Sequence, residues 1–182
     1  MIFKEVIQGK NIRLRSAEEK DAAFIVELRL NPRIRGFIGK TDPSVEKQEQ
    51  WIEEKRALSN DYHMIIESLD GTSQGTIAVY DIDFVHKRAE WGRWVIQENA
   101  GFFIAFESAV LMYHFAFNTL NLKELYFGVQ NQNTKVINFH KEFGSKITKQ
   151  DHKEIWFTFD QTCLDQVLRK YRPFHSLPIK EN

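Results

Sequence analysis

Two side chains in this sequence have the chemistry of a proton-transfer pair, and the first is Glu90 in the stretch AEWGRWVI. The stretch alternates like a β-strand, which would place Glu90 on one face with Gly92, Trp94 and Ile96. A carboxylate among apolar side chains loses hydration and holds a proton more readily, as a general base working near neutral pH requires. The alternative is an ordinary glutamate that faces solvent at a sheet edge.

The second side chain is His140, in the stretch NTKVINFHKEFG. An imidazole takes up and releases protons near neutral pH, so it suits acid catalysis. Apolar residues recur around it with the helical period, including Val136, Ile137 and Phe143, and Gly144 follows where a helix-ending glycine belongs. A packing role on this apolar face is therefore the alternative for His140.

Two further stretches could bind a ligand. In WVIQENAGFFIAFES a strand is followed by the loop 97–101 and an apolar helix, whose first N–H groups could hold an anion. An ordinary strand-to-helix connection is the alternative. The amide side chains of Asn131, Gln132 and Asn133 end the predicted strand 121–130, where they could contact a ligand or cap the next helix.

The elements that must position these residues alternate between strands and helices. Strands are predicted at 11–17, 88–96, 121–130, 145–150 and 154–160, with two more around the turn DGTSQG within 62–84. Helices are predicted at 18–31, 45–58, 102–117, 134–143 and 163–174. The order β-α-α-β-β-β-α-β-α-β-β-α predicts a mixed α/β protein, which we expect to be one domain over residues 1–182 with a polar tail from about residue 175.

The composition narrows the function classes. The 25 basic residues balance the 25 acidic ones, which argues against nucleic acid as a partner. A lone cysteine, Cys163, and a start that lacks the apolar core of a signal peptide favour the cytoplasm. The apolar stretch 102–117 is short for a membrane span and contains Glu107 and His114, so we expect a buried helix. We expect no metal.

The order of these motifs resembles the GNAT (GCN5-related N-acetyltransferase) superfamily. IRLRSAEEKDAAFIVELRLNPRIR is similar to the opening of the branch that includes ribosomal-protein N-terminal acetyltransferases and amino-sugar-nucleotide acetyltransferases. EWGRWVI resembles the fourth strand of that branch, and GFFIAFESA resembles its segment GxGxAxEA through Gly101, Ala105 and Glu107. NTKVINFHKEFGSKI resembles the family's final asparagine-to-glycine helix, although Phe103 replaces a loop glycine and Ser145 replaces a phenylalanine.

The resemblance implies an α/β GNAT fold, in which helices flank a twisted, mixed, mostly antiparallel sheet that splays between its fourth and fifth strands. It implies direct transfer of an acetyl group from acetyl-CoA to a primary amine. Glu90 would be the base, and His140 would replace a tyrosine that protonates the departing thiolate. The residues implied for acetyl-CoA binding, including backbone groups near Val95 that polarise the thioester, are Val95, Ile96, Gln97, Gly101, Phe102, Phe103, Ile104, Ala105 and Asn133.

The acceptor amine is less defined by the sequence. Arg29, Arg33 and Arg35 flank the LNP element at the implied acceptor mouth, where they could bind a diphosphate or form a solvated basic turn. Asp81 and Asp83 are second-choice bases or amine-binding carboxylates, and ordinary exposed acids of a turn are the alternative. The residues that we expect to contact the acceptor are Arg29, Asn31, Phe37, Tyr80, Asp81 and Trp94. An amino-sugar nucleotide is favoured over a protein or peptide N-terminus. A function of a different class, a non-catalytic module that binds acyl-CoA, is the alternative to an enzyme. The sequence leaves open whether the protein forms a homodimer.

Overall fold

The computed structural model describes residues 6–178, so the last four residues of the predicted polar tail lie outside it. Within this range the strands form one sheet in the order β1-β2-β3-β4-β5-β6-β8-β7. The strands are β1 (Ile7–Gln8), β2 (Ile12–Ser16), β3 (Tyr62–Ser68), β4 (Ser73–Asp83), β5 (Arg88–Ile96), β6 (Glu124–Gln130), β7 (Lys146–Gln150) and β8 (Glu154–Asp160). The predicted mixed, mostly antiparallel sheet is therefore confirmed; the two-residue strand β1 is an addition.

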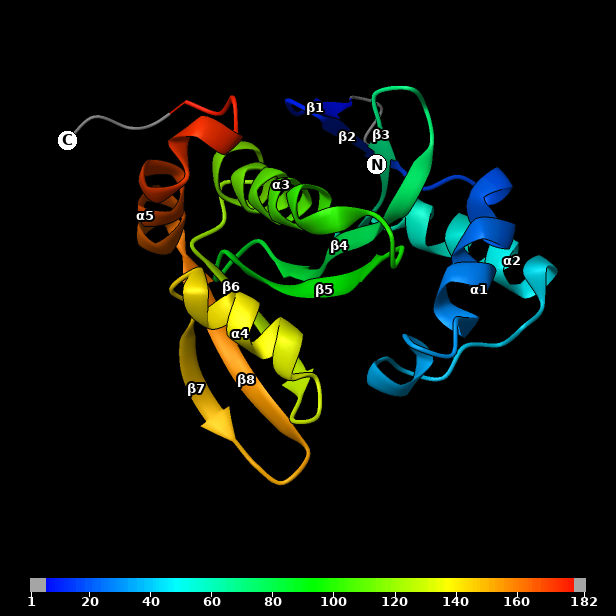
Figure 1. The fold of residues 1–182 in the computed structure, drawn as a ribbon. Helices are drawn as coiled ribbons and strands as arrows, with labels where there is room; N and C mark the ends of the chain where they lie inside the picture. The colour runs from blue at the N-terminus through cyan, green and yellow to red at the C-terminus, as the bar shows by residue number, and fades with distance from the viewer. Residues whose placement is uncertain (1–5, 179–182) are drawn as a thin grey trace.

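Helices cover both faces of the sheet (Figure 1). They are α1 (Ala22–Leu30), α2 (Val45–Ala57), α3 (Gly101–His114), α4 (Thr134–Glu142) and α5 (Gln161–Lys170). Ile25 of α1 and Ile52 of α2 form a small core with Ile65 of β3. The neighbouring residues of β3, Met64 and Ile66, point the other way into the main core with α3. This period-2 alternation gives each face of the sheet its own helices.

The pairing of β5 with β6 is parallel and short. It joins Arg88–Glu90 to Glu124–Tyr126, and it ends there. Beyond that point β6 pairs along its whole length with β8, whereas β5 continues alongside β4. The two central strands therefore diverge after Glu90, which is the splay that the family resemblance implies.

Two β-bulges interrupt the ladder between β4 and β5. One extra residue lies in β5 near Arg93 (φ 48°), and another lies in β4 near Asp81 (φ 49°). An extra residue reverses which side chains face which way. Glu90 contacts Tyr80 on the side of α1 and α2, while Trp94 packs against Ser108 of α3. The predicted common face of Glu90 and Trp94 is therefore wrong, because regular alternation does not survive the bulge.

The apolar stretch 102–117 forms α3, followed by a π-helical turn, Phe115–Thr119. The helix is buried along most of its length, as predicted, and no helix within residues 6–178 is long and apolar enough to cross a membrane. Its carboxylate Glu107 is only 1% exposed. The Glu107 carboxylate accepts a hydrogen bond from the backbone N–H of Lys10. It also accepts two hydrogen bonds from Asn11, one from the backbone nitrogen and one from the side-chain nitrogen, each at 3.0 Å.

Replacing Glu107 with leucine should destabilise the fold. The change removes the acceptor of several N–H donors of residues 10 and 11, and each hydrogen bond to a charged group contributes about 1.5–3 kcal/mol. We expect the free energy of unfolding in urea to fall by about 3 kcal/mol, and Glu142→Leu, at an exposed position of α4, to serve as the control with a change below about 1 kcal/mol. Equal effects of the two substitutions would contradict a structural role for Glu107.

Candidate active site

Glu90 lies at the point where the two central strands separate. Its partner across the parallel ladder is Tyr126, the last residue that β6 contributes to this pairing. Across the antiparallel ladder it faces Tyr80, whose hydroxyl donates a hydrogen bond of 2.5 Å to Glu90 Oε1. Burial, followed by this hydrogen bond, raises the pKa of Tyr80, so the phenol keeps its proton at neutral pH. Glu90 is thus a half-buried carboxylate held by one donor.

Arg93 packs against Tyr80 and is itself held in place by Trp51 and Asp61. Its guanidinium lies over the ring of Tyr80 at 4.0 Å and over the ring of Trp51 at 4.9 Å. It also forms a two-pronged ion pair with the buried Asp61, at 2.6 and 2.9 Å. Stacked and paired in this way, Arg93 is held rigidly. Gly92 leaves room for the Tyr80 hydroxyl, which would lie 3.1 Å from a Cβ at that position.

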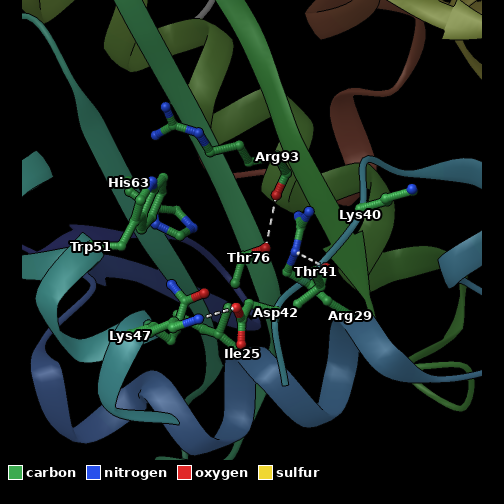
Figure 2. A pocket seen from close by; sticks show the side chains of 11 residues that line it. Ile25, Arg29, Lys40, Thr41, Asp42, Lys47, Trp51, His63, Thr76 and Arg93 are labelled. Atoms are coloured by element: carbon green, nitrogen blue, oxygen red, sulfur yellow. Dashed lines mark hydrogen bonds and ion pairs between the residues drawn. The ribbon is translucent and has the colours of Figure 1, made fainter. Parts of the chain in front are cut away.

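A cavity of about 340 Å³ lies between the sheet and the α1–α2 layer. Figure 2 shows side chains entering it from α1, from the loop before α2, from α2 and from three strands. Arg93 belongs both to this lining and to the cluster around Tyr80. Arg93 therefore connects the cavity lining to Tyr80 and, through the Tyr80 hydroxyl, to Glu90.

The lining is rich in positive charge. It includes four basic side chains, Arg29, Lys40, Lys47 and Arg93, and one carboxylate, Asp42. Asp42 pairs with Lys47 at 2.7 Å, and Arg93 pairs with Asp61, so two of the cations are neutralised.

The other two cations, Arg29 and Lys40, pair with no carboxylate in residues 6–178. Arg29 donates instead to the Thr41 hydroxyl at 2.9 Å and to the Gly39 carbonyl at 3.3 Å. Burial, and then the nearby charge of Arg93, lowers the pKa of Arg29, although a guanidinium remains charged at neutral pH. A partly buried cation without an anionic partner is a favourable site for an anion.

The beginning of α3 lies at the end of β5. The helix begins at Gly101 (φ 76°), and its N-cap residue, Ala100, provides no side-chain hydrogen bond. By contrast, Ser44, Asn133 and Asp160 each cap a helix with a side-chain oxygen. The first N–H groups of α3 are thus left without a side-chain cap beside the strand divergence, and an uncapped helix N-terminus favours a phosphate oxygen.

Residues 11–146 match the family model described as Acetyltransferase (GNAT) domain. The chain belongs to the GNAT acetyltransferase family. The match covers most of the 182 residues, including both bulged strands and α3. GNAT proteins use acetyl-CoA, and the divergence of β5 from β6 together with the uncapped start of α3 fits such a group.

The names of the GNAT relatives state different substrates. The chain is 23% identical to spermidine N(1)-acetyltransferase of Escherichia coli over 137 residues, which is 75% of this chain and 74% of the relative. The apo structure of FdhC, described as a nucleotide-linked sugar GNAT, is 29% identical, with a TM-score of 0.84 over 94% of this chain and 98% of that one. The spermidine N-acetyltransferase of Vibrio cholerae, solved with CoA and spermine, shares the fold with a TM-score of 0.75 and 19% identity, covering 85% of this chain and 98% of that one.

The residues predicted for acetyl-CoA binding lie along this GNAT opening. Val95 and Ile96 end β5, beyond its last pair with β6. Gln97 is tied to β4, because its backbone N–H donates to the Gln74 carbonyl at 2.8 Å. Phe102 and Phe103 are exposed in the first turn of α3, with Ile104 and Ala105 following.

Asn133 caps α4 in this structure. Its side-chain oxygen accepts a hydrogen bond from the Val136 N–H at 3.3 Å, which is the capping alternative considered from the sequence. Gly144 (φ 78°) ends the same helix, as predicted. A role of Asn133 in acetyl-CoA binding stays a prediction.

His140 is fully buried in an aromatic cluster. The centre of its ring lies 4.2 Å from that of Phe127 and 5.2 Å from that of Trp91, and Nδ1 lies 3.4 Å from the Tyr113 hydroxyl. Burial lowers the pKa of His140 to about 3, so the ring is neutral at pH 7. A neutral, enclosed imidazole is poorly suited to donate a proton, and its surroundings favour the packing alternative over the acid role.

The residues predicted for acceptor binding are only partly brought together. Arg29 lines the cavity. Tyr80 is outside the lining, but its ring contacts the lining residue Arg93. Trp94 points to α3, and Asn31 accepts from the Arg33 N–H at 3.0 Å within its own turn. The remaining predicted residues, Phe37 and Asp81, are exposed and outside the lining.

The other charged candidates have partners elsewhere. Asp83 accepts from the N–H groups of Val85 and His86 at 3.0 and 2.9 Å, so it stabilises the β4–β5 turn. Arg33 forms an ion pair with Glu98 in the loop before α3. This pair connects the acceptor side of the molecule to the proposed acetyl-CoA side.

Several cavity residues escaped the sequence analysis: Lys40, Trp51, His63, Thr76 and Arg93. They come from five separate elements or loops, so no spacing in the sequence relates them. Arg93 alone had a local signal, because it lies in the same strand as Glu90. The bulge that turns it toward the cavity is not visible in the alternation.

The buried state of His140 predicts how stability depends on pH. The unfolded histidine binds a proton below about pH 6.5, but the folded one does so only near pH 3. Acidification from pH 7 to pH 5 therefore stabilises the unfolded state and weakens the fold. In urea titrations, His140→Phe should lose about 2 kcal/mol less than the wild type over this range. Identical losses would show that His140 titrates normally in the folded protein.

Proposed function

We propose that this GNAT acetyltransferase acetylates the amino group of a nucleotide-linked amino sugar. The observation that carries the proposal is the pair of cations, Arg29 and Lys40, that line the cavity without a carboxylate partner among residues 6–178. A nucleotide-linked sugar carries a diphosphate, and guanidinium and ammonium groups bind its oxygens with charge-assisted hydrogen bonds. The likeness to FdhC, a nucleotide-linked sugar GNAT, supports the same class.

The charge of the cavity argues against a polyamine acceptor. Spermidine carries several positive charges, which in this cavity would approach the two cations without a carboxylate partner among residues 6–178, Arg29 and Lys40. At an effective dielectric constant of about 20, two like charges 4 Å apart repel by about 4 kcal/mol. A polyamine site needs carboxylates, yet the single carboxylate of this lining, Asp42, is already paired with Lys47. The likeness to spermidine acetyltransferases therefore supports the fold and the transfer chemistry.

A peptide N-terminus is the second candidate from the sequence. Its α-amino group is itself cationic before it loses a proton, and its backbone brings no charge that would balance Arg29 and Lys40. The cavity also lies between helices and sheet rather than along an open strand edge that could pair with an extended peptide. Both features favour the nucleotide-linked sugar.

In the proposed mechanism, acetyl-CoA supplies the acetyl thioester at the opening between β5 and β6. Glu90 takes a proton from the acceptor ammonium, and Tyr80 keeps the carboxylate oriented through its hydrogen bond. The amine nitrogen then bonds to the thioester carbon, and the carbon–sulfur bond breaks. Backbone N–H groups near Val95 stabilise the charge on the carbonyl oxygen.

The thiolate that leaves must also gain a proton. A thiol has a pKa near 8.5, so it leaves readily and needs less help than an alcohol. Water or the proton released from the amine can supply it, given the burial of His140. The acid role of His140 is tested by comparing His140→Phe with His140→Tyr. Higher activity of the tyrosine variant than of the phenylalanine variant, at equal stability, would support an acid role for position 140.

Glu90→Gln should lower kcat by about 10²–10⁴ and leave the affinity for acetyl-CoA almost unchanged, because it removes the base and keeps the side-chain size. Release of free thiol from acetyl-CoA measures kcat, and calorimetry measures the affinity. Glu124→Gln, on β6 beside the same ladder, is the control and should behave like the wild type. Full activity of Glu90→Gln would exclude Glu90 as the base. Acetyl-CoA binding without thiol release from any amine would favour the non-catalytic binding module.

Arg29→Gln should raise KM for a uridine-diphosphate-linked amino sugar about 10–100-fold, with a smaller change in kcat, because it removes one charged partner of the diphosphate. The control is Arg35→Gln, which changes an exposed arginine outside the cavity lining and should leave KM within about twofold. A KM that does not change in Arg29→Gln, at unchanged melting temperature, would refute the diphosphate site.

A further inference from the structure

His63 of β3 lines the cavity. Both of its ring nitrogens are buried, and neither has a hydrogen-bond partner within residues 6–178. The ring packs edge-on against Trp51 of α2, with 5.3 Å between the ring centres. Buried polar groups without partners are rare, because each one costs free energy. A side chain of this kind in a cavity wall is well placed to meet a polar group of a ligand.

The imidazole of His63 is uncharged. Its pKa is lowered to about 3, chiefly by burial and then by the positive charges of Arg93 and Arg29. A neutral imidazole offers one N–H donor and one nitrogen acceptor. It pairs poorly with a phosphate, which can use only the donor, and an ammonium would be repelled by the two arginines. The group that fits is an uncharged hydroxyl or amide.

The cavity has an aromatic part, which Arg93, paired with Asp61, also borders, and a cationic part with the two cations that lack a carboxylate partner within residues 6–178. Figure 2 shows Trp51 and His63 together on one side, with Lys40 and Arg29 on the other. Trp51 gives the aromatic part an apolar wall, and His63 gives it a hydrogen-bonding group. A nucleoside has this combination of a flat ring, ring amides and ribose hydroxyls, and in a nucleotide it is joined to the anion that the cationic part would hold.

We propose that His63 is a specificity-determining residue that hydrogen-bonds an uncharged group of the acceptor's nucleoside, while Arg29 and Lys40 bind the diphosphate. The inference rests on the proposed function and assigns the aromatic part of the cavity to the nucleoside. His63 then acts in recognition, and proton transfer remains with Glu90.

Calorimetric titration with two probes separates the two parts of the cavity. Uridine diphosphate carries the nucleoside and the anion, whereas inorganic pyrophosphate carries the anion alone. Saturating CoA is present throughout, so that neither probe binds at the start of α3. His63→Phe should weaken binding of uridine diphosphate about tenfold and change pyrophosphate binding less than twofold. His63→Gln should bind uridine diphosphate more tightly than His63→Phe, because an amide restores a hydrogen-bonding group. His152→Phe, in an exposed loop, is the control.

Each other outcome has a defined meaning. If His63→Phe binds uridine diphosphate like the wild type, or loses as much affinity for pyrophosphate, the inference is wrong while the proposed acceptor class stands. If the wild type binds neither probe, both are wrong. The wild-type protein provides a test that needs no folded variant: uridine diphosphate should shift the nitrogen-15 signals of the His63 ring and pyrophosphate should not. Equal shifts with both probes would overturn the inference.

Discussion

The divergence of β5 from β6 after Glu90 is the constraint on which the rest of the site depends. β6 is held along its whole length by β8, and β5 is held by β4, so the two central strands share only a short parallel ladder. The opening that results lies beside the uncapped first turn of α3. Glu90 occupies the last position before the strands part, and α3 begins after the far end of β5, so the opening runs from the proposed base to a helix end that favours an anion.

The bulge at Arg93 gives this opening its acceptor side. An extra residue in β5 turns Arg93 toward the α1–α2 layer and sends Trp94 to the opposite face. Arg93 then packs on Tyr80, which in turn holds Glu90, so the wall of the cavity and the orientation of the proposed base, Glu90, depend on one another. Charge decides what such a cavity accepts. Since Arg29 and Lys40 have no carboxylate partner in the described chain, the electrostatics favour an anionic acceptor over a polyamine.

Local signals, such as the glycine that ends α4, predicted the order of a mixed α/β protein, and the resemblance of its motifs to the family added the GNAT fold. The sequence could not predict the facing of Trp94, because one extra residue reverses an alternation that otherwise looks regular. It could not predict that His140 would be enclosed, because helical spacing shows an apolar face but not the aromatic rings that meet it. The cavity was also hidden, since His63 and Lys40 come to line one cavity only when the sheet and the helices have folded.

The central claim is that a cationic cavity selects the acceptor beside Glu90. Its most direct test compares kcat/KM of the wild-type protein for a uridine-diphosphate-linked amino sugar, for spermidine and for a short peptide with a free N-terminus, with thiol release as the common signal. The account predicts a preference of about 100-fold or more for the nucleotide-linked sugar, which declines as salt screens the cavity charges. A kcat/KM for spermidine or the peptide that equals or exceeds that of the nucleotide-linked sugar would contradict it.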